Sequence, residues 1–151
     1  MDAIEEMGVL PDFRWILVHD CWQSYFKLDC KHALCNAHLL RELIFYKEQG
    51  TQKWAEKMEN ILRKACHNPS EFKFDEWKKQ YDKIVNDGYS ENPYQPPPRA
   101  KGPRGRIAKP AVLNLLDRFK QHSSSISRFI QNHIVPFTNN LAERDIRMVK
   151  V

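Results

Sequence analysis

The sequence has no apolar run long enough to cross a bilayer, which takes about 20 residues, although 42% of its 151 residues are hydrophobic. Its first residues, MDAIEEMGVLPDF, are acidic and lack the basic and apolar regions of a signal peptide. These absences exclude a membrane-spanning protein, and we expect a cytoplasmic one.

Cysteine is sparse, with four residues at positions 21, 30, 35 and 66 and no dense disulfide framework. In a reducing compartment these residues are expected to be thiols. Cys35 and His38 form a C-x-x-H motif, but structural zinc sites usually contain two paired clusters, and no second pair follows. The motif therefore favours packing thiols and a histidine bonded to the backbone, with a small zinc-binding interaction domain as an alternative.

Acidic residues are absent from residues 92–109. Residues 92–151 contain 11 basic and 3 acidic residues, whereas residues 1–91 contain 13 basic and 16 acidic ones. This asymmetry indicates a polyanionic partner, most commonly nucleic acid, although a soluble surface would also explain it. Four of the prolines lie between Pro93 and Pro98, so we expect an extended, exposed segment. Its basic side chains, candidates for DNA phosphates, are Arg99, Lys101, Arg104, Arg106 and Lys109.

A short apolar run, Trp15 to Val18, ends at His19 and Asp20. The run is typical of a strand covered on both faces in a parallel sheet. Residues 21–31 are predicted to contain a short crossover helix, and residues 32–36 a second strand. Asp20 is therefore a candidate metal ligand at a strand end, but such an aspartate commonly bonds local backbone instead.

Helical periodicity dominates from Ala37 onward. We predict helices from Ala37 to about Gly50, from Thr51 as the N-cap through Ala65, from Ser70 to Asp87 with Gly88 as a stop, and after Pro110. In the last predicted helix, NNLAERDIRMVK, Glu143 follows Asn140 by three residues, as in a capping box. Glu143, Arg147 and Lys150 share one face, so the glutamate is equally a candidate metal ligand beside phosphate-binding cations.

Three segments, VHDCWQSYF, CNAHLLREL and VPFTNNLAERDIRMVKV, resemble in order and spacing the catalytic domain of insertion-sequence-66 family transposases. The resemblance covers nearly the whole chain. It implies a DDE transposase with a ribonuclease H-like fold, whose three carboxylates hold two divalent ions, Mg²⁺ or Mn²⁺, for DNA strand cleavage and transfer. Asp20 matches the second acid and Glu143 the third. Cys35 and His38 match a C-x-x-H signature of unclear role, and Arg144, Arg147 and Lys150 become candidate DNA contacts.

No residue matches the first acid of the family, which lies on an earlier strand. The resemblance thus predicts a fragment that is inactive alone, and a non-catalytic DNA-binding or assembly module is the alternative. We expect an α/β protein with a partial ribonuclease H-like fold of few parallel strands and a large, mainly helical insertion. Residues 1–36 would form core strands and helices, 37–135 the insertion with the loop 92–109, and 136–151 the core helix with the last acid. An unpaired sheet edge predicts self-association.

Overall fold

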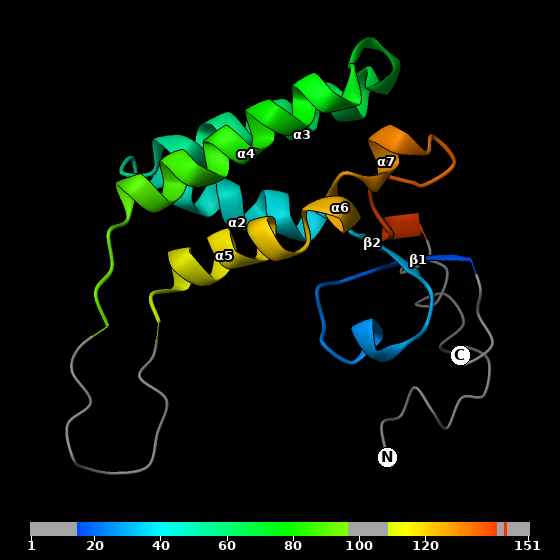
Figure 1. Cartoon of the computed structure of the whole chain (residues 1–151), viewed down its shortest axis with the longest axis horizontal. Coiled ribbons are helices and arrows are strands. Elements are labelled where there is room, and N and C mark those ends of the chain that lie inside the picture. Colours follow the sequence, from blue (N-terminus) through cyan, green and yellow to red (C-terminus); the bar gives the residue numbers. More distant parts are fainter. Residues whose placement is uncertain (1–14, 97–108, 142–143, 145–151) are drawn as a thin grey trace.

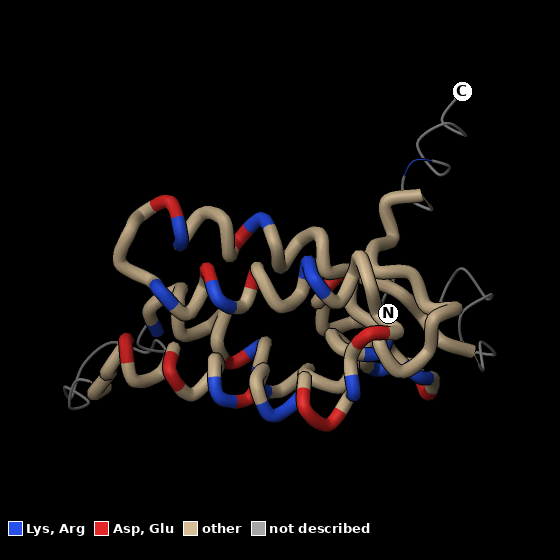
Figure 2. Tube along the Cα trace, turned by 90° about the horizontal axis from the view of Figure 1, so that it is seen from above, with Lys and Arg blue, Asp and Glu red and all other residues tan. Residues whose placement is uncertain are grey.

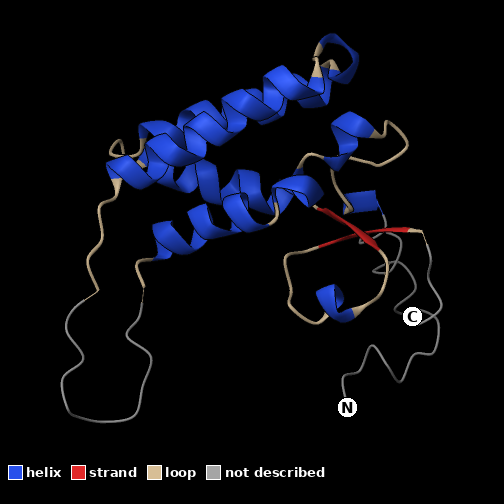
Figure 3. Ribbon diagram, viewed as in Figure 1, coloured by secondary structure: helices blue, strands red, loops and turns tan. Residues whose placement is uncertain are grey.

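The fold consists of a small parallel sheet beside a set of packed helices (Figures 1 and 3). The computed structural model describes residues 15–96, 109–141 and 144. Residues 1–14 and 97–108 lie outside them. The elements, in chain order, are β1 (Ile16–His19), η1 (Tyr25–Lys27), β2 (Lys31–Leu34), α2 (Asn36–Glu48), α3 (Lys53–His67), η2 (Pro69–Glu71), α4 (Phe74–Glu91), α5 (Ala111–Gln121), α6 (Ser123–Ile126) and α7 (Arg128–Gln131).

β1 and β2 pair in parallel, as predicted, with His19 opposite Leu34. The prediction of a strand covered on both faces was wrong, because Ile16 to Val18 are half-buried and Trp15 is 78% exposed. The described sheet has two strands. The described residues therefore show a mixed fold that is mostly helical.

The connection between the strands contains the 3₁₀ turn η1 in place of the predicted short α-helix. Phe26 stacks on His122 with ring centroids 4.4 Å apart, and its ring also meets that of His19 at 4.9 Å. These contacts with distant residues fix the turn, and no local periodicity encodes them.

The helices pack consecutively, with α2 on α3, α3 on α4 and α4 on α5 (Figure 1). Their predicted apolar faces are buried, because residues three and four apart share one side of a helix. The largest fully buried side chains of α3, α4 and α5 are Trp54, Met58, Leu62, Trp77, Tyr81, Leu115, Leu116 and Phe119. Gly50, at φ 72°, follows α2 as predicted, since glycine adopts this left-handed conformation without strain.

Gly88 does not end α4 but lies within it. A Cβ atom at this position would lie 2.5 Å from Leu116 Cδ2 and 3.0 Å from the Trp54 ring, so the glycine permits close contact with α3 and α5. The helix continues to Glu91 and is followed by Asn92.

The start of α3 also differs from the prediction, because Gln52 and not Thr51 occupies the N-cap position. The Gln52 side chain exchanges hydrogen bonds of 2.9 and 2.7 Å with Asn92 and accepts one of 2.7 Å from Trp54 Nε1. It thereby joins the beginning of α3 to the end of α4.

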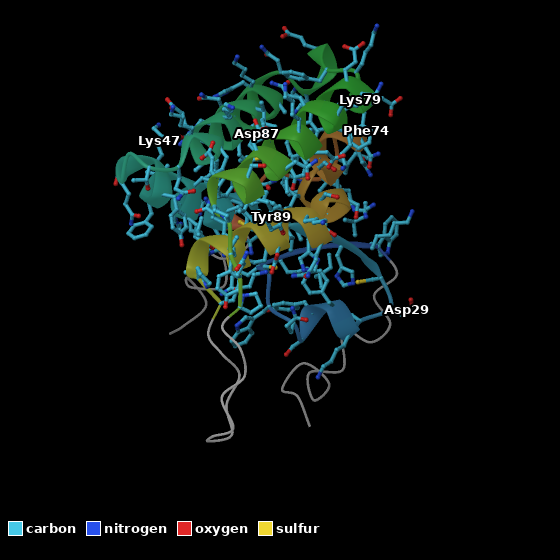
Figure 4. All side chains as sticks on the ribbon, turned by 60° about the vertical axis from the view of Figure 1, so that its left-hand side comes forward. Asp29, Lys47, Phe74, Lys79, Asp87 and Tyr89 are labelled. Atoms are coloured by element: carbon cyan, nitrogen blue, oxygen red, sulfur yellow. The ribbon has the colours of Figure 1, made fainter. Side chains whose placement is uncertain are left out.

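Lysine and arginine positions are interspersed with aspartate and glutamate positions along the helices (Figure 2). Lys47 and Lys79, for example, project outward from the helices (Figure 4). The described helices therefore present a mixed surface, and the basic residues predicted to contact DNA belong mostly to segments outside the described ranges.

Candidate metal centre

Two candidate metal ligands lie at the carboxyl edge of the sheet. Asp20 directly follows β1, and Cys35 directly follows β2. The Cys35 N–H donates a 2.9 Å hydrogen bond to the His19 carbonyl, which extends the parallel pairing by one residue. Because parallel strands end at the same edge, Asp20 and Cys35 lie side by side.

His38 approaches from the first turn of α2, whose N-cap is Cys35. Its Nδ1 lies 3.2 Å from Asp20 Oδ1. The angles do not form a hydrogen bond, and both atoms are buried without a hydrogen-bond partner among the described residues. Potential ligand atoms of Asp20, Cys35 and His38 all lie within 4.8 Å of one another.

These residues line a pocket with a volume of about 210 Å³. Arg118 and Glu42 also line the pocket. The guanidinium group of Arg118 donates two hydrogen bonds to the Glu42 carboxylate, and the one from Nη1 to Oε1 is 2.7 Å long. Trp22, another lining residue, is 71% exposed. A small ion with bound water would fit this space, and the exposed indole leaves an aromatic face at its margin.

The chain returns to this edge after α7. The Asn36 N–H donates to the Phe137 carbonyl at 3.0 Å, and the Asn139 N–H donates to Cys35 Sγ at 3.4 Å. The buried Asn36 side chain also donates to the Ile126 carbonyl at 3.2 Å. The segment that precedes the predicted last helix therefore lies against the end of β2 and the start of α2.

Two histidines support the edge from the side of η1. His19 Nε2 lies 3.0 Å from His32 Nδ1, and His32 Nε2 donates to the Leu28 carbonyl at 3.2 Å. His19 Nδ1 lies against the Asp20 carbonyl oxygen. Burial lowers the pKa of His19, so the neutral ring is favoured.

The sequence pattern placed a C-x-x-H motif at a strand-to-helix junction, and the structure confirms this position. The expectation of a histidine bonded to the backbone was wrong for His38 Nδ1, which faces Asp20. Sequence reasoning missed Arg118 and Asn139. Their contacts with the site join residues far apart in the chain, so no short motif revealed them.

The remaining predicted site residues are mostly outside the described ranges. Asn140, Leu141 and Arg144 are helical, and Arg144 is exposed. The helix thus includes Asn140, which was predicted as its N-cap. The residues outside the described ranges are Glu143, Arg147, Lys150, Arg99, Lys101, Arg104 and Arg106.

A comparison against protein families agrees with the order of the three motifs. The model of the transposase IS66 family matches residues 2–151. The chain belongs to this family. No curated protein and no solved structure matches.

Membership in the transposase IS66 family implies an interaction with DNA and the use of a divalent metal ion. Asp20 fits such an ion, because its carboxylate reaches the pocket. Cys35 and His38 fit magnesium poorly, because magnesium takes oxygen ligands. Among the described helices, none is long and apolar enough to cross a membrane.

Proposed function

We propose that this chain is part of a transposase catalytic domain that cleaves and transfers DNA strands with divalent metal ions. Asp20 and Glu143 are the proposed ligands of Mg²⁺ or Mn²⁺. When bound, such an ion activates water or a 3′-hydroxyl group and stabilises the leaving oxygen. The observation that carries the proposal is the return of the chain to the Asp20 edge, where Asn139 contacts Cys35 four residues before Glu143.

The same contacts support the proposed division of the chain. Residues 1–36 and 136–151 would form a ribonuclease H-like core, and residues 37–135 would be an insertion. The consecutive packing of α2 to α5 between the two core segments supports this division. The role of the parallel strands is to hold Asp20 at an edge that the final segment can reach.

DNA binding is assigned to the basic residues of the loop and the last helix. Positively charged side chains contact phosphates without regard to base sequence, and this binding weakens as salt increases. The proposed contacts are Arg99, Lys101, Arg104, Arg106, Arg144, Arg147 and Lys150. Replacing the four loop residues with glutamine should weaken binding of a labelled duplex and reduce its salt dependence, as measured by fluorescence anisotropy. Replacing four lysines in or directly before α4 in the same way is the matched control, and these are Lys73, Lys78, Lys79 and Lys83.

Metal binding is tested by electron paramagnetic resonance of Mn²⁺ added to the chain. Asp20→Asn and Glu143→Gln should each reduce the bound fraction, whereas Asp29→Asn, in the β1–β2 connection, should not. Equal binding by all four proteins would overturn the assignment of the two ligands.

Two of the three acids implied by the family resemblance have a match in these 151 residues. The chain tested by itself should therefore bind DNA and metal without nicking DNA, and this behaviour would also fit the alternative of a non-catalytic DNA-binding or assembly module. Metal-dependent nicking by the Asp20→Asn variant would contradict two assignments: that the chain is inactive by itself, and that Asp20 is a ligand of the catalytic ion. Self-association through a sheet edge stays a prediction, to be checked by light scattering.

A further inference from the structure

The trio of Asp20, Cys35 and His38 combines three different donor atoms at one point. The carboxylate follows β1, the thiol follows β2, and the imidazole belongs to the first turn of α2. Their potential ligand atoms lie within 4.8 Å of one another. Three separate elements therefore converge on a space small enough for one ion.

Two of these donors lack the partners that buried polar atoms normally have. Asp20 Oδ1 and His38 Nδ1 are buried, 3.2 Å apart, and neither is hydrogen-bonded within the described part of the chain. Leaving such atoms unsatisfied destabilises a folded protein. A cation between them would satisfy both lone pairs at once.

The Cys35 sulfur is buried and accepts a hydrogen bond from the backbone. The residue is 2% exposed, and its Sγ accepts the Asn139 N–H at 3.4 Å. It is also the N-cap of α2, a helix of 13 residues, whose N-terminal end carries partial positive charge. A metal-bound sulfur is a thiolate, and hydrogen bonds from outside the ligand set orient and stabilise such ligands.

We propose that Asp20, Cys35 and His38 bind a zinc ion. Thiolate and imidazole ligands suit zinc, while magnesium takes oxygen ligands. Three protein ligands and a fourth position open to water form a common type of zinc site, and the pocket of about 210 Å³ beside the trio provides room for that water.

The geometry requires a small adjustment. Bond lengths of about 2.0 to 2.3 Å to zinc place tetrahedral ligand atoms about 3.4 to 3.7 Å apart, so a separation of 4.8 Å must shorten by at most about 1.4 Å. The side chains of Asp20 and His38 are 48% and 36% exposed, which leaves them room to rotate. Cys35, fixed by two hydrogen bonds to neighbouring segments, needs to move least.

Zinc at this point would tie together the ends of β1, β2 and α2. It would also stabilise the carboxylate that the proposed function assigns to the catalytic ion, while Asp20 Oδ2 stays available for that ion. The inference depends on the ligand trio alone and holds whether or not the chain acts on DNA.

The first test is X-ray absorption spectroscopy of the whole chain loaded with one equivalent of Zn²⁺. Fitting of the extended fine structure should give one sulfur at about 2.3 Å and nitrogen or oxygen neighbours at about 2.0 to 2.2 Å. No sulfur neighbour, or two or more, would overturn the proposal. This measurement needs no substitution and is independent of whether a variant folds.

The second test replaces zinc with Co²⁺, whose bond to a thiolate gives a near-ultraviolet charge-transfer band. Cys35→Ser should abolish the band, and His38→Ala, which removes a direct ligand, should weaken cobalt binding by more than the roughly 10- to 100-fold that loss of an outer hydrogen-bond partner costs. Cys21→Ser is the matched control, since Cys21 lines the same pocket but lies outside the trio. A band that persists in Cys35→Ser, or that Cys21→Ser removes, would refute the assignment.

Loss of the cobalt band in Cys35→Ser with unchanged Mn²⁺ resonance would support separate sites for the two kinds of ion. Absence of bound Mn²⁺ together with an intact cobalt band would instead contradict the proposed function and leave the zinc site standing. The two proposals therefore fail on different measurements.

Discussion

Asp20 and His38 face each other across 3.2 Å at the carboxyl edge of the sheet, yet they form no hydrogen bond. In Asp20→Asn, the carboxylate that lies beside His38 becomes a neutral amide. We expect this variant, with EDTA present, to differ in stability from the wild type by less than about 1 kcal/mol, because a pair of side chains that are 48% and 36% exposed contributes little. The measurement is urea unfolding followed by circular dichroism.

Addition of zinc should make the wild type clearly the more stable of the two proteins. A ligand at 100 times its Kd adds about 2.7 kcal/mol to the stability of a protein that binds it, and Asp20→Asn should gain much less. Asp29, which projects from the β1–β2 connection (Figure 4), supplies the control, because Asp29→Asn should respond as the wild type does. Equal stabilisation of the wild type and Asp20→Asn by zinc would contradict the prediction.

Gly88→Ala should destabilise the protein even though alanine is the better helix former. The added methyl group would meet Leu116 Cδ2 at 2.5 Å and the Trp54 ring at 3.0 Å. Overpacking typically costs about 1 to 3 kcal/mol, and the gain in helix propensity returns at most about 1 kcal/mol. We expect a net loss of about 1 kcal/mol in thermal or urea unfolding.

Asn86→Ala, at an exposed position of the same helix, is the control for Gly88→Ala. It should change stability by less than about 0.5 kcal/mol. Equal stability of the two variants would show that Leu116 and Trp54 move aside without cost.

Glu59→Gln should remove a pH-dependent part of the stability. The Glu59 side chain is 6% exposed and pairs with Lys47 and Arg63, each at 2.8 Å. Burial raises the pKa of this carboxyl, but the hydrogen bonds from Lys47 and Arg63 outweigh it, and the pKa is lowered overall. The carboxylate therefore stabilises the fold above the ordinary glutamate pKa, and this stabilisation is lost as the pH falls through the lowered value.

We accordingly expect Glu59→Gln to be less stable than the wild type by about 1 kcal/mol at pH 7, with the difference shrinking below about pH 4. Glu76→Gln is the control, because Glu76 is 74% exposed and lies 3.6 Å from Lys73. Exposed pairs contribute little. A difference between wild type and Glu59→Gln that does not depend on pH would contradict this assignment.

Tyr81→Phe should lower stability by about 1 kcal/mol. The fully buried Tyr81 hydroxyl donates a 2.7 Å hydrogen bond to the Phe119 carbonyl and links α4 to α5. Phenylalanine would keep the packing and leave that carbonyl without this donor. Tyr46→Phe should have a smaller effect, since no hydrogen bond of the Tyr46 hydroxyl is found among the described residues. The comparison is made by urea unfolding at one pH.

The sequence by itself determined the helices and the chemistry of the motifs. Apolar residues at helical spacing, such as Trp54, Met58 and Leu62, identify buried faces because that periodicity is local. A strand that ends in Asp20, and a C-x-x-H motif at the next strand-to-helix junction, are local patterns too. Both features could therefore be predicted from the sequence without knowledge of the fold.

Only the tertiary structure decided which residues meet. Cys35 contacts Asn139, which lies 104 positions later in the sequence. Phe26 belongs to a short 3₁₀ turn, where an α-helix was predicted, and its ring stacks on that of His122. The sequence predicts Gly88 as the end of a helix. In the structure it lies within α4, where Trp54 and Leu116 leave no room for a larger side chain. Parallel pairing brings Asp20 beside Cys35, and no short sequence pattern encodes it, because the free energy of these contacts arises only when distant segments pack together.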